Sequence, residues 1–360
     1  MRVFVYEHIC GGGLAGQELP ASLAREGWAM LSCIVQDLAG IPGAKVLTTL
    51  DSRLAGSHDI LLEQGQGATS ERVHVQKIGV GEEERQVHES AAECDWTLLI
   101  APEIDGILAQ RCRWVEAAGG RLLGPSPAAV ELAADKFALD QHLKACGVPA
   151  IAGVIVRPGD PWPENLQYPA VLKPRFGAGS QQTFLIRNAQ EAAGIAAEAV
   201  REGLVADALV QPFVPGQAAS VSFLVGPHDR LALVPASQRL SNDGRFHYQG
   251  GRLPLDEPLR SRAVSLGRRA VEAVPGLLGY VGVDLVLAEQ SHRALAQDVV
   301  VEINPRLTTS YVGLRALADD NMARLMLDMA EGRPAPPIRW KPGTVTFDPD
   351  GRVNVEGVCQ

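Results

Sequence analysis

Short apolar runs alternate with amphipathic stretches over the first 125 residues of the chain. The runs have the length of strands and the amphipathic stretches the length of helices. The pattern predicts strands over residues 2–6, 44–48, 59–62, 96–101 and 121–123, and helices over 18–26, 81–92 and 104–118. This alternation is typical of an open, mostly parallel sheet, so we expect an N-terminal α/β domain over residues 1–125.

The pattern changes at Gly124-Pro125-Ser126-Pro127, which is a boundary signal. Ser126 can cap the following helix, with Pro127 at its first position. Beyond this point the pattern predicts helices over residues 127–147, 188–202 and 261–274, and strands over 151–156, 170–174, 183–186, 208–213, 219–225 and 231–237. The proline-containing tail after Gly332 is expected to dock on the body of the protein.

Composition narrows the class of protein. At 360 residues the chain exceeds one ordinary domain, and its apolar content of 46% suffices for a large core. The formal net charge of −9 argues against nucleic acid as a partner, because phosphate backbones require a basic surface. The longest apolar runs are strand-sized, so we expect no membrane partner. Cysteines at 10, 33, 94, 112, 146 and 359 form no C-x-x-C, which favours reduced thiols and a cytoplasmic location.

Two acidic residues interrupt apolar stretches near residue 300. Asp284 lies within the run 280–287, and Glu302 follows the valines at 299–301. Neighbouring antiparallel strands would hold the two carboxylates close together. With the amide oxygen of Asn304 they form a set of hard oxygen ligands that suits Mg²⁺ better than Zn²⁺. Arg306 could hold a phosphate through its planar guanidinium. The alternative is a pair of solvent-facing acids at strand ends.

A lysine and two glycines upstream could meet phosphates. Lys173 ends a predicted strand and precedes a turn that contains Gly177, Gly179 and Ser180. Glycines let backbone N–H groups approach phosphate oxygens closely. The stretch does not match G-x-x-x-x-G-K-[ST], so we predict no P-loop. An ordinary glycine-rich hairpin turn is the alternative.

Two further candidates flank this turn in the sequence. Lys136 lies in a predicted helix, where a solvated lysine is the alternative. Gln211-Pro212-Phe213-Val214 ends a predicted strand and could offer backbone groups to an adenine edge, with Phe213 against the ring. A plain strand edge is the alternative for this second stretch.

Residues 237–252 are polar, glycine-rich and aromatic. They precede the acidic motif, so we expect them to border an acceptor site. Arg239, Arg245 or Arg252 could pair with a substrate carboxylate, and Phe246 and Tyr248 could pack on an aromatic amine. A surface loop with incidental arginines is the alternative.

The order of these features resembles the ATP-grasp superfamily. The match runs through Asp135-Lys136, Val171-Leu172-Lys173-Pro174, Gly177-Ala178-Gly179-Ser180, residues 210–216, Ser220-Val221-Ser222, Gly282-Val283-Asp284 and Glu302-Ile303-Asn304-Pro305-Arg306. It covers about residues 126–330. The resemblance implies an α+β part in which a central subdomain, residues 126–207, and a C-terminal subdomain, residues 208–335, enclose ATP, with residues 336–360 as an extension.

The resemblance also implies roles for particular residues. It assigns phosphate contacts to Lys136, Lys173, Gly177, Gly179 and Ser180, adenine contacts to Gln211, Phe213 and Val214, and Mg²⁺ ligation to Asp284, Glu302 and Asn304. Mn²⁺ is the alternative metal. Lys173 and Arg306 are the candidate catalytic residues, because both would neutralise charge on the transferred phosphoryl group.

Two segments resemble one group within the superfamily. Glu7-His8-Ile9-Cys10-Gly11-Gly12-Gly13-Leu14 and residues 211–224 are similar to the tyramine–L-glutamate ligase group of methanofuran biosynthesis. Two positions depart from other members. Ala218 stands where many carry a ribose-binding glutamate, with Gln217 a weak substitute, and Gly282 stands where ligases of the D-alanine type carry arginine.

The resemblance implies an ATP-dependent carboxylate–amine ligase that forms an acyl phosphate and releases ADP and phosphate. The substrates would be a small carboxylic acid and a small amine, here the γ-carboxyl of L-glutamate and tyramine. Three alternatives stay open: a ligase for other amino acids or peptides, a carboxylase-like enzyme, and a nucleotide-binding module without catalysis. A homodimer is also left open.

Overall fold

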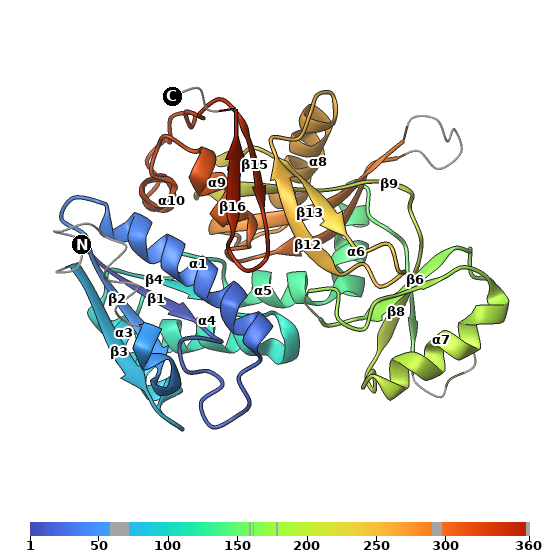
Figure 1. Cartoon of the computed structure of the whole chain (residues 1–360), viewed down its shortest axis with the longest axis horizontal. Helices are drawn as coiled ribbons and strands as arrows, with labels where there is room; N and C mark the ends of the chain where they lie inside the picture. Colours follow the sequence, from blue (N-terminus) through green and yellow to red (C-terminus); the bar gives the residue numbers. More distant parts are fainter. Residues whose placement is uncertain (58–71, 158–159, 161, 178, 290–296, 358–360) are drawn as a thin grey trace.

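The computed structural model describes residues 1–57, 72–157, 160, 162–177, 179–289 and 297–357. The described strands form three sheets, and the chain passes through them in sequence order from the N-terminal domain to the C-terminus (Figure 1). The α/β class and the parallel N-terminal sheet predicted from the sequence are confirmed.

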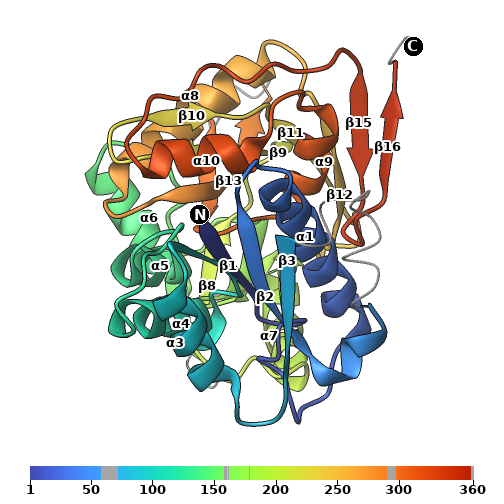
Figure 2. The same cartoon turned by 90° about the vertical axis from the view of Figure 1, so that its left-hand side faces the viewer.

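The N-terminal domain is built on four parallel strands in the order β3-β2-β1-β4 (Figure 2). Its elements are β1 (Arg2–Glu7), α1 (Ala21–Ala39), β2 (Lys45–Asp51), β3 (Val73–Ile78), α3 (Glu83–Glu93), β4 (Trp96–Ile100) and α4 (Ile107–Ala117). Side chains alternate along β1 because successive residues of a strand face opposite ways. Val3 and Val5 pack with α1, whereas Phe4 and Tyr6 pack with α3 and α4.

Several local predictions for this domain are wrong in extent. The helix predicted over 18–26 is α1, which begins after Pro20 and continues to Ala39, because apolar residues recur at helical spacing well beyond residue 26. The strand predicted over 121–123 is reduced to one bridge between Leu122 and Thr97. Strand β3 was not predicted. The strand predicted over 59–62 lies outside the described residues.

The central part carries an antiparallel sheet in the order β5-β8-β6-β7. Its elements are α5 (Pro127–Ala134), α6 (Lys136–Ala145), β5 (Val154–Val156), β6 (Ala170–Pro174), β7 (Phe184–Ile186), α7 (Ala189–Arg201) and β8 (Ala208–Pro212). The helix predicted over 127–147 is interrupted at Asp135. The Asp135 side chain accepts hydrogen bonds from the N–H groups of Phe137 and Ala138 and caps α6. Ser126 caps α5 as predicted.

The C-terminal part contains the largest sheet, ordered β14-β13-β9-β11-β12-β15-β16, with β10 paired to β9. Its elements are β9 (Gly216–Val225), β10 (Arg230–Ala232), β11 (Ala236–Leu240), β12 (Tyr248–Leu253), α8 (Leu259–Ala273), β13 (Gly279–Ala288), β14 (Val299–Asn304), α9 (Ser310–Leu317), α10 (Met322–Ala330), β15 (Thr344–Phe347) and β16 (Val353–Glu356). The tail therefore docks by adding two strands to the sheet. Strand β8 pairs with β6 of the central sheet, although residue 208 was placed in the C-terminal subdomain.

Two features of this sheet were not predicted from the sequence. The single strand expected over 231–237 is two strands, because the chain leaves β9 after β10 and Pro235 cannot donate a ladder hydrogen bond. The polar segment 237–252, for which a surface loop was the alternative, is largely the antiparallel hairpin β11–β12.

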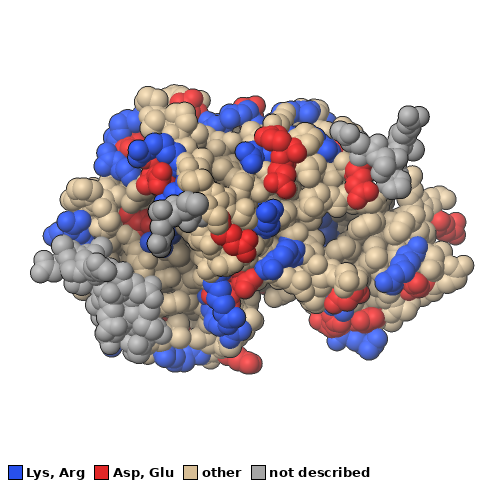
Figure 3. All heavy atoms as spheres, turned by 45° about the horizontal axis from the view of Figure 1, so that its top comes forward, with Lys and Arg blue, Asp and Glu red and all other residues tan. Residues whose placement is uncertain are grey.

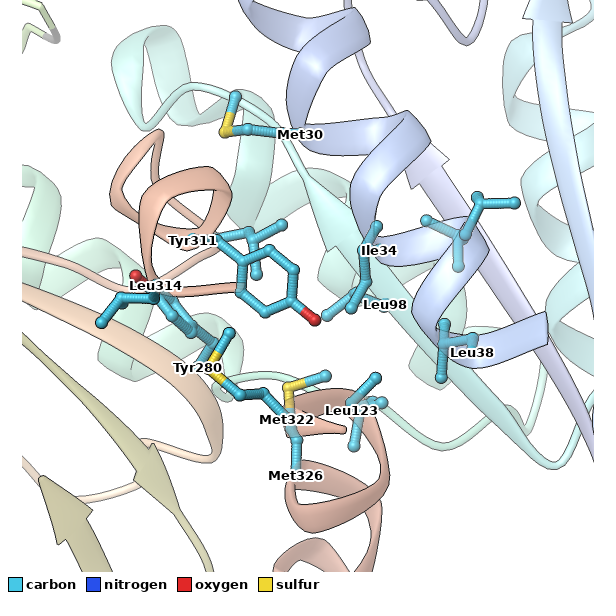
Figure 4. Close-up of a cluster of buried hydrophobic side chains, with 14 of the residues drawn as sticks. Met30, Ile34, Leu38, Leu98, Leu123, Tyr280, Tyr311, Leu314, Met322 and Met326 are labelled. Atoms are coloured by element: carbon cyan, nitrogen blue, oxygen red, sulfur yellow. The ribbon is translucent and has the colours of Figure 1, made fainter. Parts of the chain in front are cut away.

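A shared hydrophobic core joins the N-terminal domain to the C-terminal part (Figure 4). Helix α1 contributes Met30, Ile34 and Leu38, and the opposite wall comes from α9, α10 and β13. Tyr311 of α9 also donates a hydrogen bond of 2.7 Å to Asp37 of α1. Burial of this many apolar side chains holds the two parts together as one body.

Charged side chains of both signs are interspersed over the face drawn in Figure 3, with no extended basic area on that face. Within the described residues, no helix is long and apolar enough to cross a membrane.

Leu314→Ala tests the shared core. Leu314 of α9 is 1% exposed within this core, so the truncation should lower the free energy of unfolding by about 2–5 kcal/mol. Urea denaturation measures the effect. Val200→Ala on α7, where the side chain is 44% exposed, is the control and should change stability by at most about 0.5 kcal/mol. Equal effects of the two substitutions would contradict the assignment.

Candidate active site

A cavity of about 670 Å³ is lined by residues of the central and C-terminal sheets. Every residue that the sequence assigned to phosphate, adenine, metal or catalysis lines it: Lys136, Lys173, Gly177, Gly179, Ser180, Gln211, Phe213, Val214, Asp284, Glu302, Asn304 and Arg306. These residues come from segments up to 170 positions apart in the chain. The fold therefore brings the predicted groups into one site.

The two carboxylates of the acidic motif face each other across a strand pair. Asp284 of β13 is in register with Glu302 of β14, and a shift in register follows directly after this pair. Gln238 and Asn304 each donate an amide hydrogen bond to Asp284, at 2.8 and 3.0 Å. Burial, and then the adjacent Glu302, raise the pKa of Asp284. A cation between the two carboxylates would reduce the repulsion between their like charges.

The donor set fits a hard divalent cation. Two carboxylates and an amide oxygen are ligands that Mg²⁺ accepts, together with oxygens from a nucleotide phosphate. Within the described part of the chain, no group of three or more His, Cys, Asp and Glu side chains could hold a metal. Asp284, Glu302 and Asn304 could hold such a cation, with substrate oxygens completing the shell.

Two lysines lie beside the acidic pair. Lys136 begins α6, and its Nζ donates to the carbonyl of Gly177 at 2.5 Å and lies 3.9 Å from Glu302 Oε2. Lys173 belongs to β6 and is 7% exposed. Burial, and then the neighbouring Lys136, lower the pKa of Lys173 to about 8. Both ammonium groups thus lie where a polyphosphate would neutralise them.

The glycine turn after β6 contains two consecutive residues with positive φ. Gly179 and Ser180 both adopt left-handed conformations, with φ of 69° and 58°. Consecutive residues of this kind are strained for most side chains and are easily tolerated by glycine. Ala178 lies outside the described residues.

The other end of the cavity differs in detail from the prediction. The Gln211 amide is engaged inside the protein, since it donates to Asp140 at 2.5 Å and to the carbonyl of Ile151 at 2.8 Å. The ring of Phe213 stacks on Phe246, with centroids 6.0 Å apart and planes inclined by 26°. Asp140, which the sequence gave no reason to select, therefore fixes a predicted nucleotide-contacting residue.

Arg306 is held by the N-terminal domain. Glu103 lies against its guanidinium, with Oε1 2.9 Å from Nε and Oε2 accepting from Nη2 at 3.1 Å. Both side chains are largely buried, and Arg306 still lines the cavity. Glu103 precedes Arg306 by 203 positions, so no local signal in the sequence connects the two.

The structure does not bring the three candidate substrate arginines to the cavity. Arg239 pairs with Asp348, and Arg252 lies 4.0 Å from Asp256. Arg245 pairs with Glu202 and Glu198 of α7. Phe246 and Tyr248, from the same segment, do line the cavity.

Arg245 instead belongs to a contact that we call the subdomain clasp, between the β11–β12 hairpin (residues 241–247) and the central part. The Arg245 guanidinium lies 3.9 Å from the ring centroid of Phe184 and donates to the carbonyl of Thr183 at 3.1 Å. The carbonyl of Gly244 accepts from the N–H of Leu185 at 2.8 Å. The hairpin tip thus fastens the C-terminal sheet to β7 and α7.

The two departures from related proteins have local explanations. A Cβ on Gly282 would lie 2.9 Å from Cγ2 of Thr308, so any larger residue there requires the Thr308 side chain to shift. Ala218 lines the cavity without a polar group, and the Gln217 amide donates to the carbonyl of Ala218 at 2.8 Å. Neither residue offers a carboxylate to a ribose.

Comparison with known proteins places the chain in a family. A family model described as an ATP-grasp domain matches residues 133–310, and one described as a pre ATP-grasp 3 domain matches residues 44–130. The two matches follow one another in the order that the structure shows. The chain belongs to the ATP-grasp superfamily.

Within that superfamily the chain is similar to two curated relatives. The tyramine–L-glutamate ligases of Methanocaldococcus fervens and Methanocaldococcus jannaschii are 26% and 25% identical to it over 236 residues. The matches span 66% of this chain, and 66% and 63% of those two proteins, which is just under two thirds of their length. The resemblance to that group is thereby confirmed.

Solved structures support the fold. An ATP-grasp superfamily protein from Archaeoglobus fulgidus superposes with a TM-score of 0.66 at 22% identity, covering 96% of this chain and 92% of that one. An L-amino acid ligase from Bacillus licheniformis gives 0.68 at 15% identity, with 96% and 78% covered. The biotin carboxylase domain of a Hydrogenobacter thermophilus 2-oxoglutarate carboxylase, in complex with MgADP, gives 0.70 at 16%, with 96% and 73% covered.

Lys173→Ala should weaken ATP binding by about 10- to 100-fold, because it removes a buried ammonium that would pair with phosphate oxygens. Isothermal titration calorimetry measures the affinity. Lys77→Ala, at an exposed position in β3, is the control and should leave it unchanged. An unchanged affinity in the Lys173 variant would remove this lysine from the phosphate site.

Glu302→Gln should abolish the dependence of nucleotide binding on Mg²⁺ while preserving the shape of the side chain. The measured quantity is the ratio of ADP affinities in Mg²⁺ and in EDTA, which should fall towards one in the variant. Glu289→Gln, at an exposed position just after β13, is the matched control. A wild-type ratio in the Glu302 variant would show that the metal binds elsewhere.

Proposed function

We propose that this protein is an ATP-dependent carboxylate–amine ligase that works through an acyl phosphate. The observation that carries the proposal is the arrangement of charge in the cavity, where Lys136 and Lys173 lie beside the carboxylates of Asp284 and Glu302. This arrangement accepts a polyphosphate and a divalent cation together. Membership of the ATP-grasp superfamily and the similarity to two curated ligases support the same conclusion.

The residues of the chain position groups and neutralise charge. Lys136 and Lys173 hold the phosphates of ATP. Asp284, Glu302 and Asn304 hold Mg²⁺, or Mn²⁺ in its place, which when bound supplies positive charge to the phosphate oxygens. Arg306, fixed by Glu103, faces the cavity and stabilises charge on the transferred phosphoryl group.

The reaction then needs two displacements. A substrate carboxylate attacks the γ-phosphorus of ATP, forming an acyl phosphate and releasing ADP. The nitrogen of the amine attacks the acyl carbon and releases phosphate, while the nitrogen loses a proton. No side chain has to act as a nucleophile, because both bonds form between substrates.

We further propose L-glutamate and tyramine as the substrate pair, with the γ-carboxyl activated. The support is the similarity to the two tyramine–L-glutamate ligases, which are 26% and 25% identical to this chain. Phe246 and Tyr248 line the cavity and offer aromatic surface to a phenolic amine.

Incubation with ATP, Mg²⁺, L-glutamate and tyramine should yield ADP, phosphate and γ-glutamyltyramine, identified by mass spectrometry. Aspartate should react about 10²-fold more slowly, because its carboxyl is one methylene short of the γ-phosphate. An amide formed only from another acid–amine pair would reject these substrates and retain the ligase class. Absence of phosphate release with every acid–amine mixture would leave a nucleotide-binding module.

A further inference from the structure

One carboxylate in the cavity has no part in the chemistry above. Among the described residues, the lining side chains that carry or can gain charge are Lys136, Lys173, Arg306, Asp284, Glu302, His247 and Glu26. In the proposed reaction, the two lysines hold phosphates, and Asp284 and Glu302 hold the metal. Arg306 is paired with Glu103. Glu26 is the third carboxylate, and it comes from α1 of the N-terminal domain.

The side chain of Glu26 is open to a cationic ligand. Thr309 Oγ1 donates to Glu26 Oε1 at 3.2 Å. Over the described ranges, Oε2 of Glu26 has no hydrogen-bond partner, and Glu26 forms no ion pair within 4.0 Å. Arg306 interacts electrostatically with Glu26, but its guanidinium is already paired with Glu103. The carboxylate, which lines the cavity, therefore keeps one oxygen without a partner among the described residues.

The position of Glu26 is fixed by the packing of α1. Glu26 and Met30 are four positions apart and lie on the same face of the helix. Met30, Ile34 and Leu38 are buried in the shared core, so this face of α1 is turned toward the C-terminal part (Figure 4). Behind Glu26, a Cβ on Gly27 would lie 2.7 Å from the buried Glu7 carboxylate, so α1 packs closely on the Glu7 side chain at this point.

We propose that Glu26 binds the ammonium group of a substrate. An ammonium ion has three N–H donors and prefers a carboxylate partner, and such charge-assisted hydrogen bonds are among the strongest in proteins. The inference rests on the proposed ligase function, because the substrates of that reaction enter this cavity. Two groups qualify, the α-ammonium of an amino-acid substrate and the ammonium of the amine that enters as acceptor.

Binding measurements on pairs of probes separate these two sources. Calorimetry on the protein saturated with Mg²⁺ and ADP compares tyramine with 4-ethylphenol, and L-glutamate with glutarate, because each second compound lacks the ammonium. The wild-type protein should prefer the ammonium compound of one pair by about 10- to 100-fold. Glu26→Gln should lose that preference and keep the affinity for ADP. The pair that is affected identifies the source.

Glu18→Gln is the matched control, since Glu18 precedes α1, is exposed and does not line the cavity. It should keep the wild-type preference. A preference that survives in Glu26→Gln, or a wild-type protein without preference in either pair, overturns the assignment.

Turnover is not needed for this test, so its failure is distinguishable from failure of the proposed function. A protein that forms no amide but shows a Glu26-dependent preference would reject the proposed reaction and support the ammonium site. A protein that forms the amide without such a preference would support the proposed reaction and reject the ammonium site.

Discussion

The electrostatic repulsion between Asp284 and Glu302 is the constraint around which the site is organised. The pairing of β13 with β14 sets the two carboxylates opposite one another, and both side chains are only partly exposed to solvent. The surrounding groups all reduce this repulsion: Gln238 donates to Asp284, and Lys136 lies near Glu302. A divalent cation would reduce it further, so the apoprotein is electrostatically prepared for its ligands before they arrive.

The N-terminal domain takes part in the site through two separate attachments. The shared core under α1 fixes the domain against the C-terminal sheet, and the Glu103–Arg306 pair reaches from that domain into the cavity. A buried ion pair is a weak source of stability, because desolvation offsets much of its Coulombic gain. Its value here is geometric, since the guanidinium of Arg306 is held in one orientation beside the candidate metal ligands.

How well each site residue could be predicted depends on how far along the sequence it lies from the residues that it contacts. Asp284 and Glu302 were predictable because they interrupt neighbouring apolar strands, and pairing of adjacent strands is a local rule. Glu26 reaches the cavity, and Glu103 reaches Arg306, from another domain, and only the packing of that domain places them there. Arg245 was a candidate substrate arginine, but it lies in the turn between β11 and β12 and pairs with Glu198 and Glu202, to which no local signal in the sequence connects it.

The subdomain clasp makes the cavity sensitive to the ionic strength of the surrounding solution. It combines a backbone hydrogen bond at Gly244, a ring contact between Phe213 and Phe246, and the ion pairs of Arg245 with α7. The ion pairs are partly exposed, with 38% of the Glu202 side chain accessible. Dissolved ions screen such pairs and leave the apolar contact intact. Ionic strength therefore acts on the hairpin and on nucleotide exchange more than on the buried charges beneath it.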